Sequence, residues 1–269
     1  LTAVTAFSQT PMKTAAEAKL SASDLAVKIA DRILATTTYE FKNTKTGKTY
    51  KSVKNLPLDM NVKVACKYNN WHYTNGVTHI ALMELADKTG AKKYDDYVLK
   101  NMNFVFNEGN LDFFKKQYEQ AMKNEGWYGV RKLSWHMIFR GKRLDDNGPM
   151  GASLIDLQMK HPNNSFLNYI NETAEHLNYG EPRLADGTIA RIWPHENTIW
   201  ADDAFMAISF LARMAKMTGD MSYINDAANQ VIKYHKYLWC PEKRILYHCY
   251  HTDTDEHGVA CLLYTSDAA

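Results

Sequence analysis

The sequence WADDAFMAISFLARMAKMTGD at residues 200–220 predicts the class of fold. Over residues 204–217 it is apolar on almost every side, which predicts a helix surrounded by protein. The residues at 218–220, Thr-Gly-Asp, indicate that this helix ends and that another begins. Apolar residues then recur at helical spacing over 223–234 with polar residues between them, so we expect a half-exposed second helix. Together the two segments predict a helical hairpin.

The same pairing of a buried and an amphipathic helix recurs twice upstream. Apolar residues repeat at helical spacing over 77–85 and 94–105, separated by a glycine stop, and again over 150–159 and 166–177. Alternating buried and half-exposed helices fit a closed ring of hairpins whose inner helices face a central cavity. A superhelical helical repeat is the competing architecture.

Other segments are less periodic. A first helix is expected to begin at the Ser23-Asp24 cap. The polar linkers at 36–60 and 180–199 are expected to be loops at the ends of the ring, and residues 245–248 are expected to be a short extended piece. Because loops commonly carry function, these linkers are candidate parts of a site.

The composition of the 269 residues argues against several kinds of partner. Lys plus Arg is 32 and Asp plus Glu is 30, giving a net charge of +2, and no long basic run is present, so we expect no nucleic-acid partner. No apolar run reaches the ~18 residues of a membrane helix, so we expect no membrane partner. Cys66, Cys240 and Cys249 show neither CxxC spacing nor an even count. We expect no disulfide, no metal, no organic cofactor and no obligate protein partner.

Polar clusters with aspartates and aromatic residues occur just before the buried helices, at 71–76 (WHYTNG), 144–148 (LDDNG) and 200–203 (WADD). One aspartate at a helix N-terminus is often only a cap, worth about 1 kcal/mol. Two pairs of adjacent aspartates accompanied by indoles are more than capping needs. Because adjacent side chains on a helix point about 100° apart, one aspartate of each pair can cap the helix while the other faces the cavity. A cavity lined by indoles and carboxyl groups suits a sugar. Core packing is the alternative for Trp71 and Trp200.

Four motifs follow one another along the chain: Trp71-x-Tyr73-x-Asn75-Gly76-Val77, Leu144-Asp145-Asp146-x-Gly148-x-Met150-Gly151-Ala152, Trp200-Ala201-Asp202-Asp203-x-Phe205-Met206 with Phe210-Leu211-Ala212-Arg213-Met214, and Tyr247-His248. In this order, from about residue 20 to residue 260, the chain resembles the unsaturated rhamnogalacturonyl hydrolases of glycoside hydrolase family 105. The resemblance implies an all-α fold, the (α/α) six-hairpin toroid. It also implies a glycosidase of polysaccharide degradation.

The implied reaction removes a terminal 4,5-unsaturated uronic acid from lyase-generated oligosaccharides of the pectin or rhamnogalacturonan type. Water adds across the C4–C5 double bond by protonation at C4 and attack at C5, and the resulting hemiketal opens and releases the next sugar. Asp202 resembles the general acid and base, with Asp203 as the alternative. Asp146 resembles the second active-site carboxylate, with Asp145 as the alternative.

The residues expected to bind the substrate are Trp71, Tyr73, Asp145, Arg191, His195, Trp200, Asp203 and His248. His248 matches a family histidine at the cavity, and the two tryptophans match aromatics that stack on the unsaturated ring. Arg191 and His195 are candidates for holding the uronate carboxylate, because a planar guanidinium binds carboxylates through two hydrogen bonds. His195 fits a solvent-exposed loop histidine equally well. Two aspartates facing one pocket would raise a carboxyl pKa, as proton donation near neutrality requires.

Three other functions compete with this one. The related unsaturated glucuronyl hydrolases of family 88 share the helical toroid and the two aspartates, so activity on glycosaminoglycan or ulvan fragments is the nearest alternative. A non-catalytic helical array that binds carbohydrate or protein on its concave face is an alternative of another class, and it predicts that the aspartate pairs point outward as caps. A toroid sugar epimerase ranks third, because only His248 among the histidines is well placed.

The two ends of the chain are expected to lie outside the catalytic domain, a partial (α/α) barrel predicted over 20–260. Residues 1–9 resemble the end of a signal peptide, so residues 1–19 predict export to the periplasm or beyond, with a cytoplasmic location as the alternative. Residues 261–269 resemble a translated transposon-end sequencing adapter. The family's Trp-Gly-Arg-x-x-Gly-Trp segment does not follow residues 257–260. We therefore expect an incomplete toroid that lacks its C-terminal hairpins, with an exposed apolar seam and weak or no activity.

Overall fold

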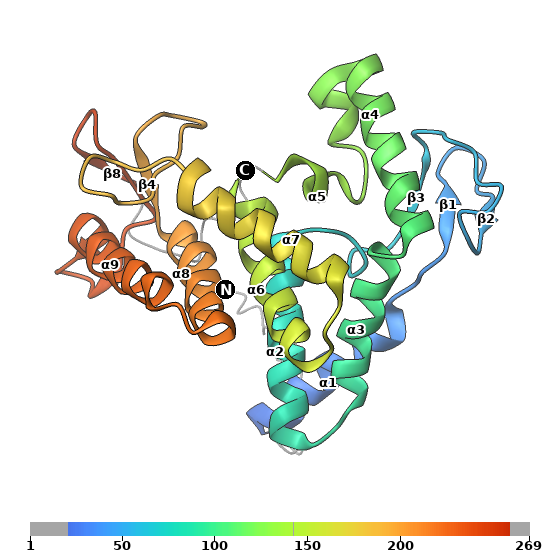
Figure 1. Ribbon diagram of the computed structural model, residues 1–269, viewed down its shortest axis with the longest axis horizontal. Helices are drawn as coiled ribbons and strands as arrows, with labels where there is room; N and C mark the ends of the chain where they lie inside the picture. The colour runs from blue at the N-terminus through green and yellow to red at the C-terminus, as the bar shows by residue number, and fades with distance from the viewer. Residues whose placement is uncertain (1–20, 142, 259–269) are drawn as a thin grey trace, which may run out of the picture.

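The computed structural model describes residues 21–141 and 143–258, and most of these residues are helical (Figure 1). The helices are α1 Ala22–Thr36, α2 Tyr73–Thr89, α3 Lys93–Val105, α4 Glu108–Val130, α5 His136–Arg140, α6 Leu144–Lys160, α7 Asn164–Glu175, the π-helix η1 His176–Gly180, α8 Ala201–Thr218 and α9 Met221–Leu238. The short strands are β1 Phe41–Asn43, β2 Thr49–Tyr50, β3 Val62–Val64, β4 Thr198–Trp200, β5 Trp239–Cys240, β6 Ile245–Leu246, β7 Cys249–His251 and β8 Glu256–His257. The predicted N-terminal segment 1–19 and tail 261–269 lie outside the described residues.

Three helical hairpins form the body of the molecule. α2 packs on α3, α6 on α7 and α8 on α9, as the sequence periodicity predicts. α6 also packs on both α2 and α8, so these three helices form an inner row with α6 in the middle (Figure 1). The predicted arrangement of helical hairpins is confirmed. Among the described residues, no helix contains an apolar window long enough to cross a membrane.

The inner helices α2 and α8 end at the predicted glycine stops. Gly90 and Gly219 have φ angles of 71° and 76°, in the left-handed region that favours glycine. Their N–H groups donate to the carbonyls of Ala86 and Ala215, which satisfies the last turn of each helix. α9 then begins immediately, because the Asp220 side chain accepts a hydrogen bond from a backbone N–H of its first turn.

Glycines let the inner helices approach closely. A Cβ atom on Gly76 of α2 would lie 2.3 Å from the carbonyl carbon of Pro149 on α6. A Cβ atom on Gly148 of α6 would lie 2.8 Å from the Cβ of Met206 on α8. Both glycines lie within the motifs at the starts of these helices, so the close approach fixes the first turns of α2, α6 and α8 relative to one another.

Three local predictions were wrong. α1 begins after Ser21, whose hydroxyl accepts from the N–H of Asp24, so Ser23 is inside the helix. Leu144 begins α6, so the aspartates after it belong to the first turn of the helix. The segment 36–60 contains β1 and β2, which form an antiparallel sheet in the order β2-β1-β3. Phe41 in β1 is buried at the centre of this sheet, which explains why the polar segment is ordered.

A second small sheet, in the order β4-β7-β8, connects the start of α8 to the end of the described chain. Trp200 in β4 pairs with Cys249 in β7, and the Ala201 N–H donates to the carbonyl of His248 at 2.8 Å. The pairing places a residue far along the sequence beside the first turn of α8. On the opposite side of that helix from its core contacts, Phe205 is 49% exposed, so α8 is less completely covered than its apolar sequence predicts.

Candidate active site

The two aspartate pairs lie in the first turns of α6 and α8. First-turn N–H groups have no partner inside a helix and favour negative charge. Asp146 and Asp203 are 0% and 2% exposed, whereas the side chains of Asp145 and Asp202 are partly exposed. One member of each pair therefore points into the protein while its neighbour reaches solvent, as the divergence of adjacent helical residues requires.

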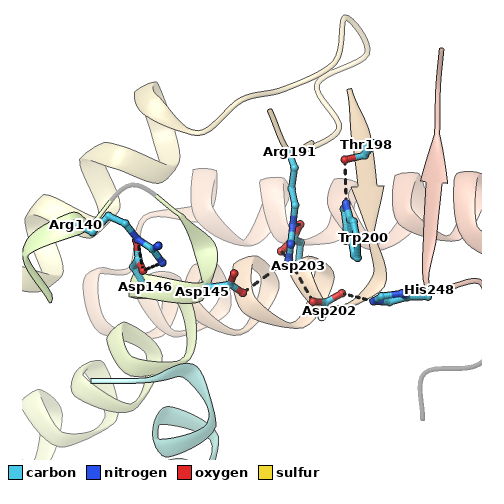
Figure 2. A network of polar contacts seen from close by, with 9 residues as sticks. All are labelled: Arg140, Asp145, Asp146, Arg191, Thr198, Trp200, Asp202, Asp203 and His248. Carbon is cyan, nitrogen blue, oxygen red and sulfur yellow. Dashed lines mark hydrogen bonds and ion pairs between the residues drawn. The ribbon is translucent and has the colours of Figure 1, made fainter. Parts of the chain in front are cut away.

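Arg191 connects the two pairs (Figure 2). Its Nε and Nη2 atoms donate to the two carboxylate oxygens of Asp203 at 2.6 and 2.7 Å. Nη2 also donates to Asp202 Oδ2 at 3.2 Å and lies 3.8 Å from Asp145 Oδ1. The main chain of Arg191 pairs with that of Thr198 in β4, so the strand leading into α8 holds the guanidinium over the first turn of the helix.

The aspartates that surround Arg191 form a carboxylate cluster. One oxygen from each of Asp145, Asp202 and Asp203 lies within 4.8 Å of the others. Burial raises the pKa of Asp203 to about 7, and the charges of Asp202 and Asp145 add to this effect while Arg191 opposes it. Burial disfavours the charged form of Arg191, but the hydrogen bonds and charges of the aspartates outweigh burial and raise its pKa. The cluster thus contains a carboxyl group that holds a proton up to near-neutral pH.

Three carboxylates at this spacing are also a donor set for a divalent cation. The Arg191 guanidinium, however, lies among them and already donates to Asp203 and Asp202. A metal ion would be repelled by that guanidinium, so the geometry favours an ion-pair cluster over a metal centre. The expectation that the protein needs no metal stays a prediction.

Trp200 and His248 form one wall beside Asp202. The guanidinium carbon of Arg191 lies 4.6 Å from the centroid of the Trp200 ring, and the His248 ring meets the same indole edge-on at 4.7 Å. His248 Nε2 lies 3.5 Å from Asp202 Oδ1 (Figure 2). Burial lowers the pKa of His248, although the charge of Asp202 opposes the shift, so the neutral imidazole is favoured. The structure therefore brings together six of the predicted residues, which are Asp145, Arg191, Trp200, Asp202, Asp203 and His248.

Asp146 is outside this cluster. Arg140 Nε donates to both oxygens of its carboxylate at 2.8 and 2.6 Å, and Nη2 of the same arginine donates to Oδ1. The side chain is fully buried. The α6 carboxylate that meets Asp202 and Arg191 is therefore Asp145, and the role of Asp146 as the second active-site carboxylate stays a prediction. Sequence alone left these two aspartates as alternatives because both are in the same helical turn.

Trp71 is 1% exposed, so the prediction that its indole stacks on a sugar is wrong. Its Nε1 donates to the backbone carbonyl of Asp146 at 2.6 Å, and its ring packs edge-on against Tyr169 at 4.9 Å. The core interpretation is therefore correct for this tryptophan. Its indole positions the first turn of α6, which holds Asp145 and Asp146.

Two other predicted residues lie near the edge of the site or away from it. Tyr73 begins α2 and is half-buried, with its ring tilted against that of His72 at 4.3 Å. His195 lies in an exposed loop, 5.7 Å from the ring of His251. In the part of the chain that the structure describes, no hydrogen bond or ion pair joins the His195 side chain to the carboxylate cluster. The loop-histidine interpretation fits this placement.

A cavity of about 510 Å³ adjoins the carboxylate cluster. It is lined by Arg140, Arg143, Leu144, Asp145, His176, Gly180, Glu181, Pro182, Arg191, Ile192, Trp193 and Asp203. The sequence motifs do not include Arg140, Arg143, His176, Glu181 or Trp193. The two arginines immediately before the motif at 144–148 were the available signal, whereas the loop residues carry no periodic pattern.

The hairpins and the carboxylates at their helix starts define a protein of the α/α toroid class. A possible member of glycoside hydrolase family 105 from Salmonella enterica is similar, with a TM-score of 0.56, 14% identity, and coverage of 94% of this chain and 58% of that one. A family 105 glycoside hydrolase from C. acetobutylicum has a TM-score of 0.55 and 20% identity, and the match covers 88% of this chain and 53% of that one. A third similar structure is an inactive double-aspartate variant of a Salegentibacter α-1,6-mannanase in complex with α-1,6-mannotetrose. Its TM-score is 0.54 and its identity 13%, and the match covers 88% of this chain and 58% of that one. Identities this low show the fold alone.

Residues 46–260 match the model of Glycosyl Hydrolase Family 88. This match covers most of the sequence, so the chain belongs to that family. None of the curated proteins matches it. The chain spans 53–58% of the length of the similar structures named above.

Proposed function

We propose that this chain comes from a glycosidase that removes a terminal 4,5-unsaturated uronic acid from lyase-generated oligosaccharides of the rhamnogalacturonan type. Membership of Glycosyl Hydrolase Family 88 supports the class of reaction. The observation that carries the proposal is the partly exposed Asp202 carboxylate, placed against an indole, an imidazole and two further carboxyl groups. Such a surface combines a stacking wall with groups that hold and transfer a proton.

In this proposal Asp202, as the acid, donates its proton to C4 of the unsaturated ring. Positive charge then develops at C5, and a water molecule attacks there while the Asp202 carboxylate accepts the proton that the water loses. The product is a hemiketal at C5, which opens to a ketone. The hemiacetal left at C1 then opens and releases the next sugar, so one water molecule is consumed and Asp202 is again protonated.

The residues around Asp202 have separate roles in this proposal. Arg191 donates to Oδ2 and stabilises the carboxylate form after proton transfer. Asp145 and Asp203 surround the same guanidinium, and burial keeps a proton on Asp203 up to a pH of about 7. His248 would lie beside the attacking water because it borders Asp202, and Trp200 would lie beside the ring because its indole packs against His248 and Arg191.

The experiment incubates the glycosidase from which this chain comes with three unsaturated oligosaccharides, prepared by lyases from rhamnogalacturonan, chondroitin and ulvan. Turnover is followed as loss of the ultraviolet absorbance of the double bond and as release of the shortened sugar. We expect the fastest turnover on the rhamnogalacturonan product. Faster turnover on chondroitin or ulvan products would replace the substrate with a glucuronyl one, which the match to family 88 favours as the second candidate. Binding of these sugars without turnover of any would support a non-catalytic module instead.

A further inference from the structure

The outer helix α9 holds the chain segment that leads to Arg191. Gln230 of α9 is fully buried against this segment. Its side-chain Oε1 accepts a hydrogen bond from the backbone N–H of Ile189 at 3.0 Å, and its Nε2 donates to the backbone carbonyl of Gly187 at 3.0 Å. One side-chain amide therefore satisfies backbone groups that a neighbouring strand would otherwise satisfy.

Two further residues on the same face of α9 support this contact. Asp226, one turn before Gln230, accepts a hydrogen bond from Gln230 Nε2 at 2.9 Å and pairs with Arg183 at 3.0 and 2.8 Å. Both hydrogens of the Gln230 amide are thus used, which determines its orientation. Tyr234, one turn after Gln230, is buried, and its hydroxyl donates to the carbonyl of Ile189 at 3.3 Å. Residues four positions apart share a helix face, so consecutive turns of α9 hold one segment.

The backbone of this segment has few other partners. It forms two isolated antiparallel bridges, Arg183 with Ile189 and Arg191 with Thr198, and neither belongs to one of the named strands on both sides. Isolated bridges lack the repeated hydrogen bonds of a ladder, so they restrain the backbone less than a sheet does. The contacts of Gln230 and Tyr234 with Ile189 therefore supply much of the restraint just before Arg191.

Arg191 follows Ile189 by two positions, so its side chain leaves the backbone close to the restrained residue. Its guanidinium donates to both oxygens of Asp203 at 2.6 and 2.7 Å and to Asp202 Oδ2 at 3.2 Å (Figure 2). A pair of parallel hydrogen bonds requires an accurate position and orientation of the guanidinium. A backbone displacement of about 1 Å would therefore weaken the contacts of Arg191 with both aspartates.

We propose that Gln230 is a positioning residue, which holds residues 187–191 so that Arg191 reaches Asp202 and Asp203. The inference rests on the proposed function for the reaction that it serves. Gln230 is not one of the described residues that line the cavity, so it acts through Arg191 and not on the substrate. An outer helix thereby determines the geometry of a site built at the starts of the inner helices.

The main test is a double-mutant cycle in kcat, measured on an unsaturated disaccharide with the glycosidase from which this chain comes. Gln230→Met keeps the length of the side chain and removes its hydrogen bonds with the segment. We expect it to lower kcat about 10-fold to 100-fold with little change in KM. In an Arg191→Gln background the same substitution should lower kcat by less than about 2-fold, because no guanidinium remains to be positioned. Equal reductions in the two backgrounds overturn the inference.

Gln117→Met is the matched control. Gln117 of α4 is also buried, and its Nε2 donates to the backbone carbonyls of Asp59 and Val62 at 2.7 and 2.8 Å. Its replacement removes the same kind of contact from a different segment, so stability should fall as in Gln230→Met while kcat stays unchanged. A loss of kcat in folded Gln117→Met as large as that in Gln230→Met would show a general effect of lost stability and would overturn the inference.

Hydrogen exchange followed by mass spectrometry tests the restraint without turnover. We expect Gln230→Met to speed exchange of the peptide covering residues 187–193 about 10-fold or more, and Gln117→Met to leave that peptide unchanged. Unchanged exchange in folded Gln230→Met contradicts the proposal. If Gln230→Met does not fold, Tyr234→Phe takes its place in the cycle and in the exchange measurement, because it removes only the hydroxyl that donates to Ile189.

The two readouts separate this inference from the proposed function. Absence of turnover by the unchanged protein on every unsaturated oligosaccharide overturns the proposed function, and the positioning role falls with it even where the exchange result holds. Turnover by the unchanged protein together with an unaltered kcat in folded Gln230→Met overturns this inference alone.

Discussion

At Asp202 two neighbours act on one carboxyl group from different sides. Arg191 donates to Oδ2 at 3.2 Å, while His248 Nε2 lies 3.5 Å from Oδ1. The adjacent Asp203 is buried and holds its proton to a pH of about 7. Asp202 and Asp203 are neighbours in one helical turn, yet their side chains point in different directions. The Asp202 carboxyl group is therefore accessible, whereas the Asp203 carboxyl group is buried and retains a proton.

We expect turnover to fall as the pH rises above about 7. The raised pKa of Asp203 means that its carboxyl is protonated below this pH and ionised above it, which adds negative charge around Asp202 and removes a proton from the cluster. The measurement is kcat on the unsaturated disaccharide from about pH 5 to about pH 9. Asp203→Asn has no proton to lose there, so its alkaline fall should disappear. A profile that stays level above neutrality would contradict this reading of the cluster.

The sequence predicts the helices more clearly than the short strands. The helices of the three hairpins carry apolar residues about 3.6 positions apart over two or more turns. Glycines directly after α2 and α8 mark where these helices end. Both signals can be recognised in the sequence, so the sequence predicts these helices. The strands β1 and β3 are three residues each, too short for an alternation of period two to be recognised among polar neighbours. Trp71 and Trp200 both precede an inner helix, yet one is buried and the other borders the site. Local sequence does not encode that difference, because it depends on which neighbouring helix packs against each indole.

Gly76→Ala should destabilise the protein by about 3 kcal/mol or more, because the added Cβ would lie 2.3 Å from the main chain of α6. Gly109→Ala in the first turn of α4 is the matched control, since its Cβ would make an ordinary contact of 3.4 Å with Val53. That control should stabilise the protein by up to about 1 kcal/mol through helix propensity. Chemical denaturation of the two variants measures both effects. Similar stabilities for the pair would show that α2 and α6 do not pack as closely as described.

Across the whole molecule, stability should depend on pH through a buried histidine in α2. His79 is 3% exposed, and its Nδ1 has no hydrogen-bond partner among the described residues. Burial lowers its pKa from 6.5 to about 4. Above pH 6.5 the imidazole is neutral in both the folded and the unfolded chain. Between 6.5 and about 4 only the unfolded chain binds the proton, so stability is lost as the pH falls through this interval.

The expected loss from His79 is about 3 kcal/mol between neutral pH and about pH 4. Urea denaturation at a series of pH values measures it. His79→Phe keeps a flat ring beside Tyr97 without a titrating group. Over the same pH interval, its free energy of unfolding should therefore fall by about 3 kcal/mol less than that of the unchanged protein. Parallel stability profiles for the two proteins would mean that His79 does not resist protonation in the folded state.

The site is assembled on the scale of the whole molecule from residues that the sequence separates widely. Asp145 comes from α6, Arg191 from the loop before β4, Asp202 from α8 and His248 from the segment before β7. Motif spacing identified the aspartates and the histidine because they recur at helix starts and in a recognisable order. It did not identify Arg143 or the cavity, because the loop at 180–193 folds beside α6 through tertiary packing that no local period records.

In the proposed mechanism, Asp202 transfers the proton that adds water to the unsaturated uronate. Its most direct test compares Asp202→Asn with Asp87→Asn, an exposed aspartate at the far end of α2, in the double-bond absorbance assay. We expect Asp202→Asn to lower kcat by about 1000-fold or more and Asp87→Asn to leave it unchanged. Near-normal turnover by a folded Asp202→Asn protein would contradict the account.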